Sequence, residues 1–282
     1  MDKDKTLYIS DLDDTLLNKN SVISEYTKDA LNEMISVGIN STIATGRTTD
    51  AAERIMSGVG LNVPIASFNG AVFYDVKQKW YVKIYGLSAE TVGNIIVVLK
   101  SHDIPALMYE LRDETIAAYY ESLEDRHIRD FIDNRKSRYG SVFRLVHDLG
   151  GIPQEHVMYF TLIGAYDRIK PVYDALKLIS GINISMVDDT ASAGFWWLEI
   201  FSAEASKESA VMFLRETYGF NKVVCFGDNY NDLPMFKVCD VRVAVNNALD
   251  SVKTAADHIC GSNNDDGVVK WIMNHINRTK TV

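Results

Sequence analysis

Three short β-prone runs of this chain each end at a cluster of polar residues, and this repetition constrains the fold more than any other feature of the sequence. The runs cover residues 6–10, 39–44 and 222–226. The polar clusters that follow them include Asp11, Thr45 and Asp228. Helix-like segments alternate with the runs, and strands that alternate with helices of about 10–15 residues indicate βαβ units. We therefore predict an α/β chain with a doubly wound, Rossmann-like parallel sheet.

The segment between residues 87 and 200 has a different pattern from the rest of the chain. Two helix-like stretches, residues 89–100 and 167–178, alternate there with several strand-like pieces. The strand-like pieces are residues 106–109, 116–120, 157–163, 182–187 and 196–201. Several strands for each helix favour an α+β insert with an antiparallel sheet. We therefore predict a discontinuous core of residues 1–86 and 201–282, with an inserted domain at residues 87–200.

One part of this insert, residues 121–138, alternates acidic and basic residues. It contains five acids and five bases. Pairs four residues apart, such as Asp125 with Arg129, favour a salt-bridged helix face. The alternative for the same residues is a clamp for a sugar phosphate.

The composition excludes several classes of function. The chain has 29 Lys and Arg residues against 38 Asp and Glu residues, a formal charge of −9. Such a surface repels phosphate backbones and anionic lipids, so we expect neither a nucleic acid nor a membrane as a partner. Three cysteines without metal-ligand spacing favour a reducing compartment. The charged start of the sequence is unlike a signal peptide, and we predict a cytoplasmic protein.

Two carboxylates, Asp11 and Asp13, follow the first predicted strand. If the strand geometry continues, both side chains point to one side and Leu12 points to the other. Two carboxylates this close favour a proton or a cation between them, and oxygen ligands suit Mg²⁺. The alternative is a solvated acidic turn.

Further polar residues follow the other predicted strands. Thr45, Gly46 and Arg47 could hold an anion, or could form an ordinary turn from strand to helix. Asp228 leaves an apolar strand shortly before Asn231 and Asp232, and the alternative for that segment is an Asx-turn. Lys207 follows Ser206, a possible helix cap. The alternative is an ordinary solvated lysine, but a lysine at a helix start is better explained if it holds an anion. Because ligands of open α/β sheets bind at the carboxyl ends of the strands, we expect these residues to converge.

These segments together resemble the haloacid dehalogenase (HAD) superfamily of phosphohydrolases. Its four ordered motifs are similar to residues 11–15, residues 44–47, Lys207 and residues 227–235. The insert and the sequence Asn69-Gly70-Ala71 resemble the Cof-type branch, whose large α/β cap is called type C2B. The resemblance spans nearly the whole chain. It implies a HAD-like core, residues 1–86 and 201–282, and a C2B-type cap, residues 87–200.

The resemblance also implies a role for each matching residue. Asp11 would be the nucleophile that forms an aspartyl-phosphate, and Asp13 would be the general acid and base. The implied Mg²⁺ ligands are Asp11, Asp13 through its backbone carbonyl, Asp228, and Asp232, which would bind or orient the metal. The implied phosphate-binding residues are Thr45, Gly46, Lys207, Asn231 and Arg47.

The sequence departs from the family pattern at three positions. The family usually has Gly where Asp14 stands, and Gly commonly lies beside the lysine, where this chain has Ala205 and Glu208. An additional carboxylate at Asp14 must point away from a bound phosphate or be paired, because it would otherwise oppose anion binding.

The resemblance implies an enzyme: an Mg²⁺-dependent phosphatase for a small phosphomonoester such as a sugar phosphate, acting as a monomer or weak homodimer. A phosphosugar mutase of the same fold is the nearest alternative. A signalling receiver also combines acidic residues, a Thr and a Lys, but it has no place for Asp13 or for the insert. A non-catalytic phosphate-binding module is the remaining alternative, motivated by Asp14, Ala205 and Glu208.

Overall fold

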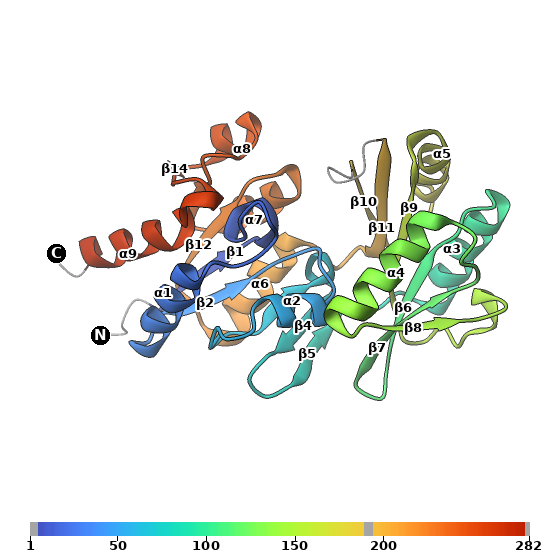
Figure 1. Cartoon of the computed structure of the whole chain (residues 1–282), viewed down its shortest axis with the longest axis horizontal. Helices are drawn as coiled ribbons and strands as arrows, with labels where there is room; N and C mark the ends of the chain where they lie inside the picture. Colours follow the sequence, from blue (N-terminus) through green and yellow to red (C-terminus); the bar gives the residue numbers. More distant parts are fainter. Residues whose placement is uncertain (1–4, 189–193, 280–282) are drawn as a thin grey trace. The chain divides into compact units, whose positions relative to one another are not determined.

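The computed structural model describes residues 5–188 and 194–279. The chain divides into two compact units, shown in Figure 1. Unit 1 comprises Met1–Lys83 and Ser206–Val282, and unit 2 comprises Ile84–Ala205. Among the described residues, no helix combines the length and the apolar character needed to cross a bilayer.

Unit 1 is built on a five-stranded parallel sheet with the strand order β14-β13-β12-β1-β2. The strands are β1 (Thr6–Ser10), β2 (Asn40–Ile43), β12 (Lys222–Gly227), β13 (Val241–Ala244) and β14 (His258–Ile259). β1 lies at the point where the order reverses, between β12 and β2. The prediction of a doubly wound parallel sheet is therefore confirmed, and a reversal of this kind is where ligands bind in such sheets.

Helices flank this sheet, and capping residues account for several of their ends (Figure 1). The helices are α1 (Glu25–Ser36), α2 (Thr49–Ile55), α6 (Lys207–Tyr218), α7 (Leu233–Val238), α8 (Asp250–Ala255) and α9 (Gly267–Thr279). α1 packs against α9, and α6 packs against α7. The predicted cap Ser24 accepts a hydrogen bond from the Thr27 amide at 3.0 Å. Gly219 ends α6 in the left-handed conformation, which a glycine adopts without steric cost.

The β-prone run at residues 64–68 predicts a further strand of the parallel sheet, but it forms part of a small antiparallel sheet that was not expected. Its strand order is β3-β4-β5. The strands are β3 (Ile65–Ser67), β4 (Val72–Asp75) and β5 (Trp80–Ile84). Between β3 and β4 lies the short helical turn η2 (Phe68–Gly70).

Unit 2 contains a six-stranded sheet with the order β10-β11-β9-β6-β7-β8. The strands are β6 (Leu107–Arg112), β7 (Thr115–Tyr120), β8 (Val142–Leu145), β9 (Val157–Ala165), β10 (Ile182–Asp188) and β11 (Phe195–Ser202). The prediction of an antiparallel sheet is confirmed for most of the strand pairs, but β8 pairs in parallel with β7. The sheet is therefore mixed. β8 was not predicted, because its residues are mostly exposed and lack a clear alternation.

Helices cover both faces of this sheet. They are α3 (Ala89–Ser101), α4 (Arg126–Tyr139) and α5 (Tyr166–Leu176). α3 and α5 pack on one face over Met108, Phe160 and Leu198. α4 lies on the other face, because Phe131 meets Trp197, and neighbours in a strand point to opposite sides.

The predicted ion pair between Asp125 and Arg129 of α4 is wrong. Asp125 is the N-cap of α4, and its carboxylate accepts hydrogen bonds from the amides of His127 (2.8 Å) and Ile128 (3.1 Å). Arg129 instead donates to the carbonyl of Leu123 at 3.0 Å. A cap carboxylate satisfies free amides of the first turn and complements the helix dipole, so Asp125 faces its own helix end.

We expect Asp125→Ala to lower the unfolding free energy by about 1 kcal/mol, because two amides at the start of α4 lose their acceptor. The matched control is Asp130→Ala on the same helix, which removes only the exposed ion pair with Arg126 and should cost about 0.5 kcal/mol or less. Urea unfolding of both variants measures the difference. Equal losses would contradict the assignment of Asp125 as a cap.

Candidate active site

The carboxyl ends of three neighbouring strands of unit 1 lie level with one another. Ser10 at the end of β1 pairs with Phe226 of β12 and with Ile43 of β2. Asp11 follows β1 directly, Thr45 follows β2 by two residues, and Asp228 follows β12 directly. The predicted convergence of these three residues at one sheet edge therefore follows from the register of the sheet.

Lys207 is the buried cation of this edge. Its Nζ atom lies 2.7 Å from Asp11 Oδ1 and 2.6 Å from Asp232 Oδ1, and its side chain is 1% exposed. Burial alone would lower the pKa of Lys207, but the two carboxylates raise that pKa well above its usual value. Ser206 caps α6 as predicted, by accepting a hydrogen bond from the Ser209 amide at 2.9 Å. Lys207 is therefore a charged lysine at a helix start, held there by two carboxylates.

Three buried carboxylates lie together around this lysine. Asp11, Asp228 and Asp232 each offer an oxygen within 4.8 Å of the others. Burial raises the pKa of Asp11 well above its usual value, against the opposing effect of Lys207. Burial and the charge of Asp232 raise the pKa of Asp228 to about 7. Three carboxylates exceed the one ammonium charge, and an all-oxygen donor set of this kind fits a hard divalent cation such as Mg²⁺.

Asp232 connects this carboxylate group to the backbone after β12. Its Oδ2 atom accepts hydrogen bonds from the amides of Asp228 (2.9 Å) and Asn229 (3.0 Å), while Oδ1 accepts from Lys207. A Cβ atom at Gly227 would lie 2.5 Å from Asp232 Cβ, so this close approach requires glycine. Asp232 thus fixes the direction of Asp228 and of Lys207 at the same time.

Asp13 is held by a different cation. Arg47 Nε lies 2.7 Å from Asp13 Oδ2, and Arg47 Nη2 lies 2.5 Å from Asp13 Oδ1. The Asp13 side chain is 46% exposed, whereas that of Arg47 is 13% exposed. The carboxylates of the edge therefore divide into a buried group around Lys207 and an accessible one on Arg47.

The turn η2 supports the segment that carries Thr45, Gly46 and Arg47. The amide of Asn69 donates to the Thr45 carbonyl at 2.9 Å, and the amide of Phe68 donates to the Arg47 carbonyl at 2.9 Å. A Cβ atom at Gly46 would lie 3.1 Å from Asn69 Oδ1. The sequence marked Asn69 and Gly70 only by their family resemblance, and their contacts show that they brace this loop.

Gly70 connects the same turn to the start of α6. Its φ angle is +88°, and a Cβ atom there would lie 2.3 Å from the Ser206 carbonyl oxygen. The residue before Lys207 therefore packs directly against the backbone of η2. A single turn thus positions both the Thr45 loop and the helix start that carries Lys207.

Two further residues complete the description of the edge. Thr15, which the sequence did not single out, donates from Oγ1 to Asp228 Oδ1 at 2.6 Å. Its only signal was its place in the segment Asp11-Leu12-Asp13-Asp14-Thr15. Asn231 lies in the turn η4 (Tyr230–Asp232) with an exposed side chain, and within residues 5–188 and 194–279 no hydrogen bond joins that side chain to the other predicted site residues.

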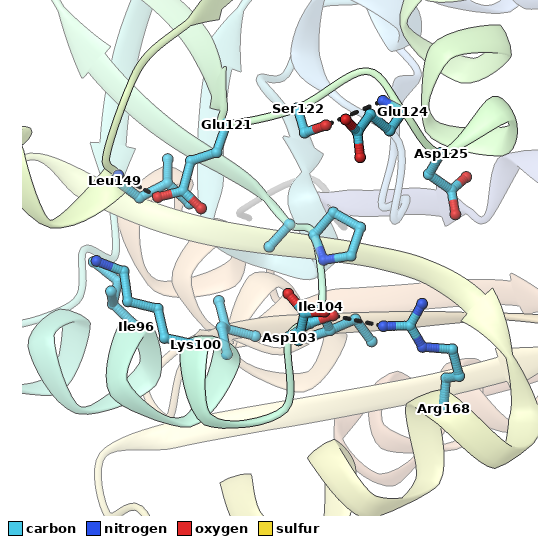
Figure 2. Close-up of a pocket in the computed structure, with 13 residues that line it drawn as sticks. Ile96, Lys100, Asp103, Ile104, Glu121, Ser122, Glu124, Asp125, Leu149 and Arg168 are labelled. Atoms are coloured by element: carbon cyan, nitrogen blue, oxygen red, sulfur yellow. Dashed lines mark hydrogen bonds between the residues drawn. The ribbon is translucent and has the colours of Figure 1, made fainter.

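A hollow of about 550 Å³ in unit 2 contains none of the predicted site residues (Figure 2). Several of the charged groups at its wall are engaged with neighbours. These contacts join Lys100 Nζ to Asp148 Oδ1 (2.6 Å), Arg168 to the Asp103 carbonyl (2.5 Å) and the Leu149 amide to Glu121 (2.8 Å). The concentration of buried titratable groups is at the sheet edge of unit 1, so we place the candidate site there.

Comparison with known families identifies the family to which the chain belongs. The model of the haloacid dehalogenase-like hydrolases matches residues 8–272, which include every predicted site residue. The chain belongs to this family. The resemblance inferred from the four motifs is thereby confirmed, and this HAD-family chain is an enzyme of the phosphatase type.

Two curated relatives of the chain are named phosphatases. The 5-amino-6-(5-phospho-D-ribitylamino)uracil phosphatase YitU of Bacillus subtilis is 26% identical over 269 residues, which cover 94% of this chain and 95% of the relative. The pyridoxal phosphate phosphatase YbhA of Escherichia coli is 26% identical over 274 residues, which cover 94% of this chain and 97% of the relative. Both relatives therefore align with the HAD chain over almost their full length.

Solved structures show the same fold. A haloacid dehalogenase-like hydrolase from Bacteroides thetaiotaomicron has a TM-score of 0.78 and 26% identity, and the match covers 95% of this chain and 98% of that chain. A sugar phosphatase of HAD subclass IIB has a TM-score of 0.74, and the match covers 96% of this chain and 99% of that chain. At 18% identity, this second likeness shows the fold alone.

The structure shows the conformation or burial of each of the three residues that depart from the HAD pattern. Asp14 has a φ angle of +55°, in the left-handed region that favours the family's glycine, and its side chain is exposed. Partial burial and the charge of Asp13 raise the pKa of Asp14. Glu208 lies in the first turn of α6, where a negative charge is favourable, and Ala205 is fully buried.

Gly70→Ala tests the role of η2. The variant must move the Ser206 carbonyl, so we expect it to lose stability and to lower the rate of phosphate release by displacing Lys207. Gly38→Ala is the matched control, because Gly38 has a φ angle of +91° but open space around it. The control should cost about 1–2 kcal/mol of unfolding free energy from backbone strain and leave turnover intact. Equal effects of both variants on turnover would contradict the proposed brace.

We expect the chelated protein to lose stability as the pH rises from about 4 to about 7. The folded-state pKa of Asp228 is about 7, above the ordinary value for an unfolded carboxyl, so the folded protein binds more protons in this window. For one such group the unfolding free energy falls by about 1.4 kcal/mol for each pH unit. Urea unfolding in EDTA measures this slope, and Asp228→Asn should reduce it. An unchanged slope in that variant would contradict the raised pKa.

Proposed function

We propose that the protein is an Mg²⁺-dependent phosphatase that hydrolyses a small phosphomonoester, such as a sugar phosphate, through an aspartyl-phosphate on Asp11. The observation that carries this proposal is the separation of two carboxylate systems at one sheet edge. Asp11 belongs to the buried group around Lys207, whereas Asp13 is accessible and paired with Arg47. A nucleophile and a proton donor need such different environments.

The reaction follows from these two residues. An Asp11 oxygen forms a bond to phosphorus while the bond between phosphorus and the leaving oxygen breaks, and Asp13 gives that oxygen its proton. A water molecule then attacks phosphorus, the bond between Asp11 and phosphorus breaks, and Asp13 takes a proton from the water. The products are an alcohol and inorganic phosphate, and both aspartates return to their first state.

The remaining residues would bind the phosphoryl group and the metal. We assign the metal to Asp11, Asp228 and the Asp13 backbone carbonyl, with Asp232 orienting Asp228 and Lys207. When bound, Mg²⁺ would neutralise charge on the phosphate oxygens. Lys207 and the segment of Thr45 and Gly46 would hold the phosphoryl group, and the exposed Asn231 would contact it from η4. Arg47 belongs to the same segment and is paired with Asp13.

The relatives support a small substrate with a primary alkyl phosphate. The substrates named for YitU and YbhA each carry one phosphate ester on a short carbon chain or group attached to a nitrogen heterocycle. We propose a substrate of this general class for the present chain. We further propose that unit 2 is a C2B-type cap, that the chain acts as a monomer or weak homodimer, and that it works in the cytoplasm.

Asp11→Asn should abolish phosphate release, because an amide cannot form the aspartyl-phosphate. The assay supplies p-nitrophenyl phosphate and a panel of small phosphomonoesters with Mg²⁺, and a matched sample contains EDTA. Asp29→Asn, an exposed position on α1, is the control and should retain full activity. Turnover that survives in Asp11→Asn, or that is unaffected by EDTA, would overturn the proposal.

A further inference from the structure

Arg47 lies in the phosphate-binding segment of the chain, yet its guanidinium is paired with the acid Asp13. The two contacts, 2.7 Å from Nε to Oδ2 and 2.5 Å from Nη2 to Oδ1, engage both oxygens of that carboxylate. An arginine fork that meets a carboxylate in this way fixes its plane as well as its position. A lysine could supply the charge but not this orientation.

The backbone of Arg47 is itself fixed at both ends. Its amide donates to Thr45 Oγ1 at 3.2 Å, and its carbonyl accepts from the Phe68 amide at 2.9 Å. The Arg47 side chain is mostly buried, whereas the Asp13 side chain is 46% exposed. The fixed guanidinium of Arg47 therefore holds the carboxylate of Asp13 in a position that a ligand can still reach.

We infer that Arg47 is a positioning residue for Asp13, and that its contribution to the reaction depends on how much the leaving group needs a proton. This inference rests on the proposed function. Each carboxylate oxygen has two lone-pair sites, so Asp13 can bind the fork of Arg47 and still carry the transferable proton. Proton transfer requires a donor at hydrogen-bond distance in a fixed direction, and the fork supplies that direction.

The leaving group distinguishes this role from phosphate binding. An alkoxide is a poor leaving group, so Asp13 must give its proton as the bond between phosphorus and oxygen breaks. p-Nitrophenolate is a stable anion near neutral pH and leaves without that proton. A residue that positions Asp13 therefore matters for alkyl phosphates, whereas a residue that holds the phosphoryl group matters equally for both kinds of substrate.

The experiment compares kcat/KM for p-nitrophenyl phosphate with kcat/KM for a primary alkyl phosphate that the wild-type protein hydrolyses. The ratio kcat/KM reports the first phosphoryl transfer, before water attacks the intermediate. We expect Arg47→Ala to lower the alkyl value about 100-fold and the aryl value only a few fold, with an unchanged inhibition constant for inorganic phosphate. Arg47→Lys should fall between Arg47→Ala and the wild type. Arg54→Ala, on the exposed surface of α2, is the control and should match the wild type.

A double-mutant cycle with Asp13→Asn provides the second test. If Arg47 acts through Asp13, Arg47→Ala should have no further effect on the alkyl substrate in an Asp13→Asn background. Equal losses on both substrates together with weaker phosphate inhibition would overturn the inference and assign Arg47 to phosphate binding, and full activity of Arg47→Ala would overturn it as well. Failure of the proposed function itself is recognised separately, because turnover would then survive in Asp11→Asn.

Discussion

The ion pairs of Lys207 with Asp11 and Asp232 are the interaction on which the site depends. They join the start of α6 to the end of β1 and to the segment after β12, with all three side chains almost completely buried. Charges withdrawn from water in this way are tolerated only while each keeps its partners, and the loss of one partner typically costs about 3–5 kcal/mol. The positions of Lys207, Asp11 and Asp232 are therefore coupled, because none of the three side chains can move without breaking an ion pair.

The arrangement of charge resolves a conflict between the protein and its proposed substrate. The chain carries a formal charge of −9, and most of the titratable groups at the edge are themselves acidic. An anion can bind there only where cations dominate locally. Lys207 provides fixed positive charge, and a divalent cation on the carboxylates would complete it. An acidic protein could then bind its proposed small anionic substrate at this one place.

The sequence was sufficient for the parts of the molecule whose signal is local. Apolar runs that end in polar clusters predicted β1, β2 and β12, and the caps Ser24 and Ser206 marked two helix starts. Features that depend on residues far away in the sequence could not be predicted from it. Thr15 gains its meaning only beside Asp228, and Asp125 was wrongly paired because spacing along a helix does not show that a carboxylate faces the helix end. β8 is exposed and short, so its partner strand defines it more than its own residues do.

The central pair of strands in unit 1 joins two segments that lie far apart in the sequence. β1 pairs in parallel with β12, and the pairing begins with Thr6 opposite Lys222. The whole of unit 2 lies between these two strands in the sequence. During synthesis on the ribosome, β1 can therefore pair with β12 only after residues 222–227 have emerged, whereas β2, at residues 40–43, follows it soon. Pairing of β1 with β12 closes a long loop and is therefore slow, because the closure costs chain entropy. We expect unit 2, which lies inside that loop, to fold earlier as an independent body. The candidate site would then be assembled last, after unit 2 has already folded.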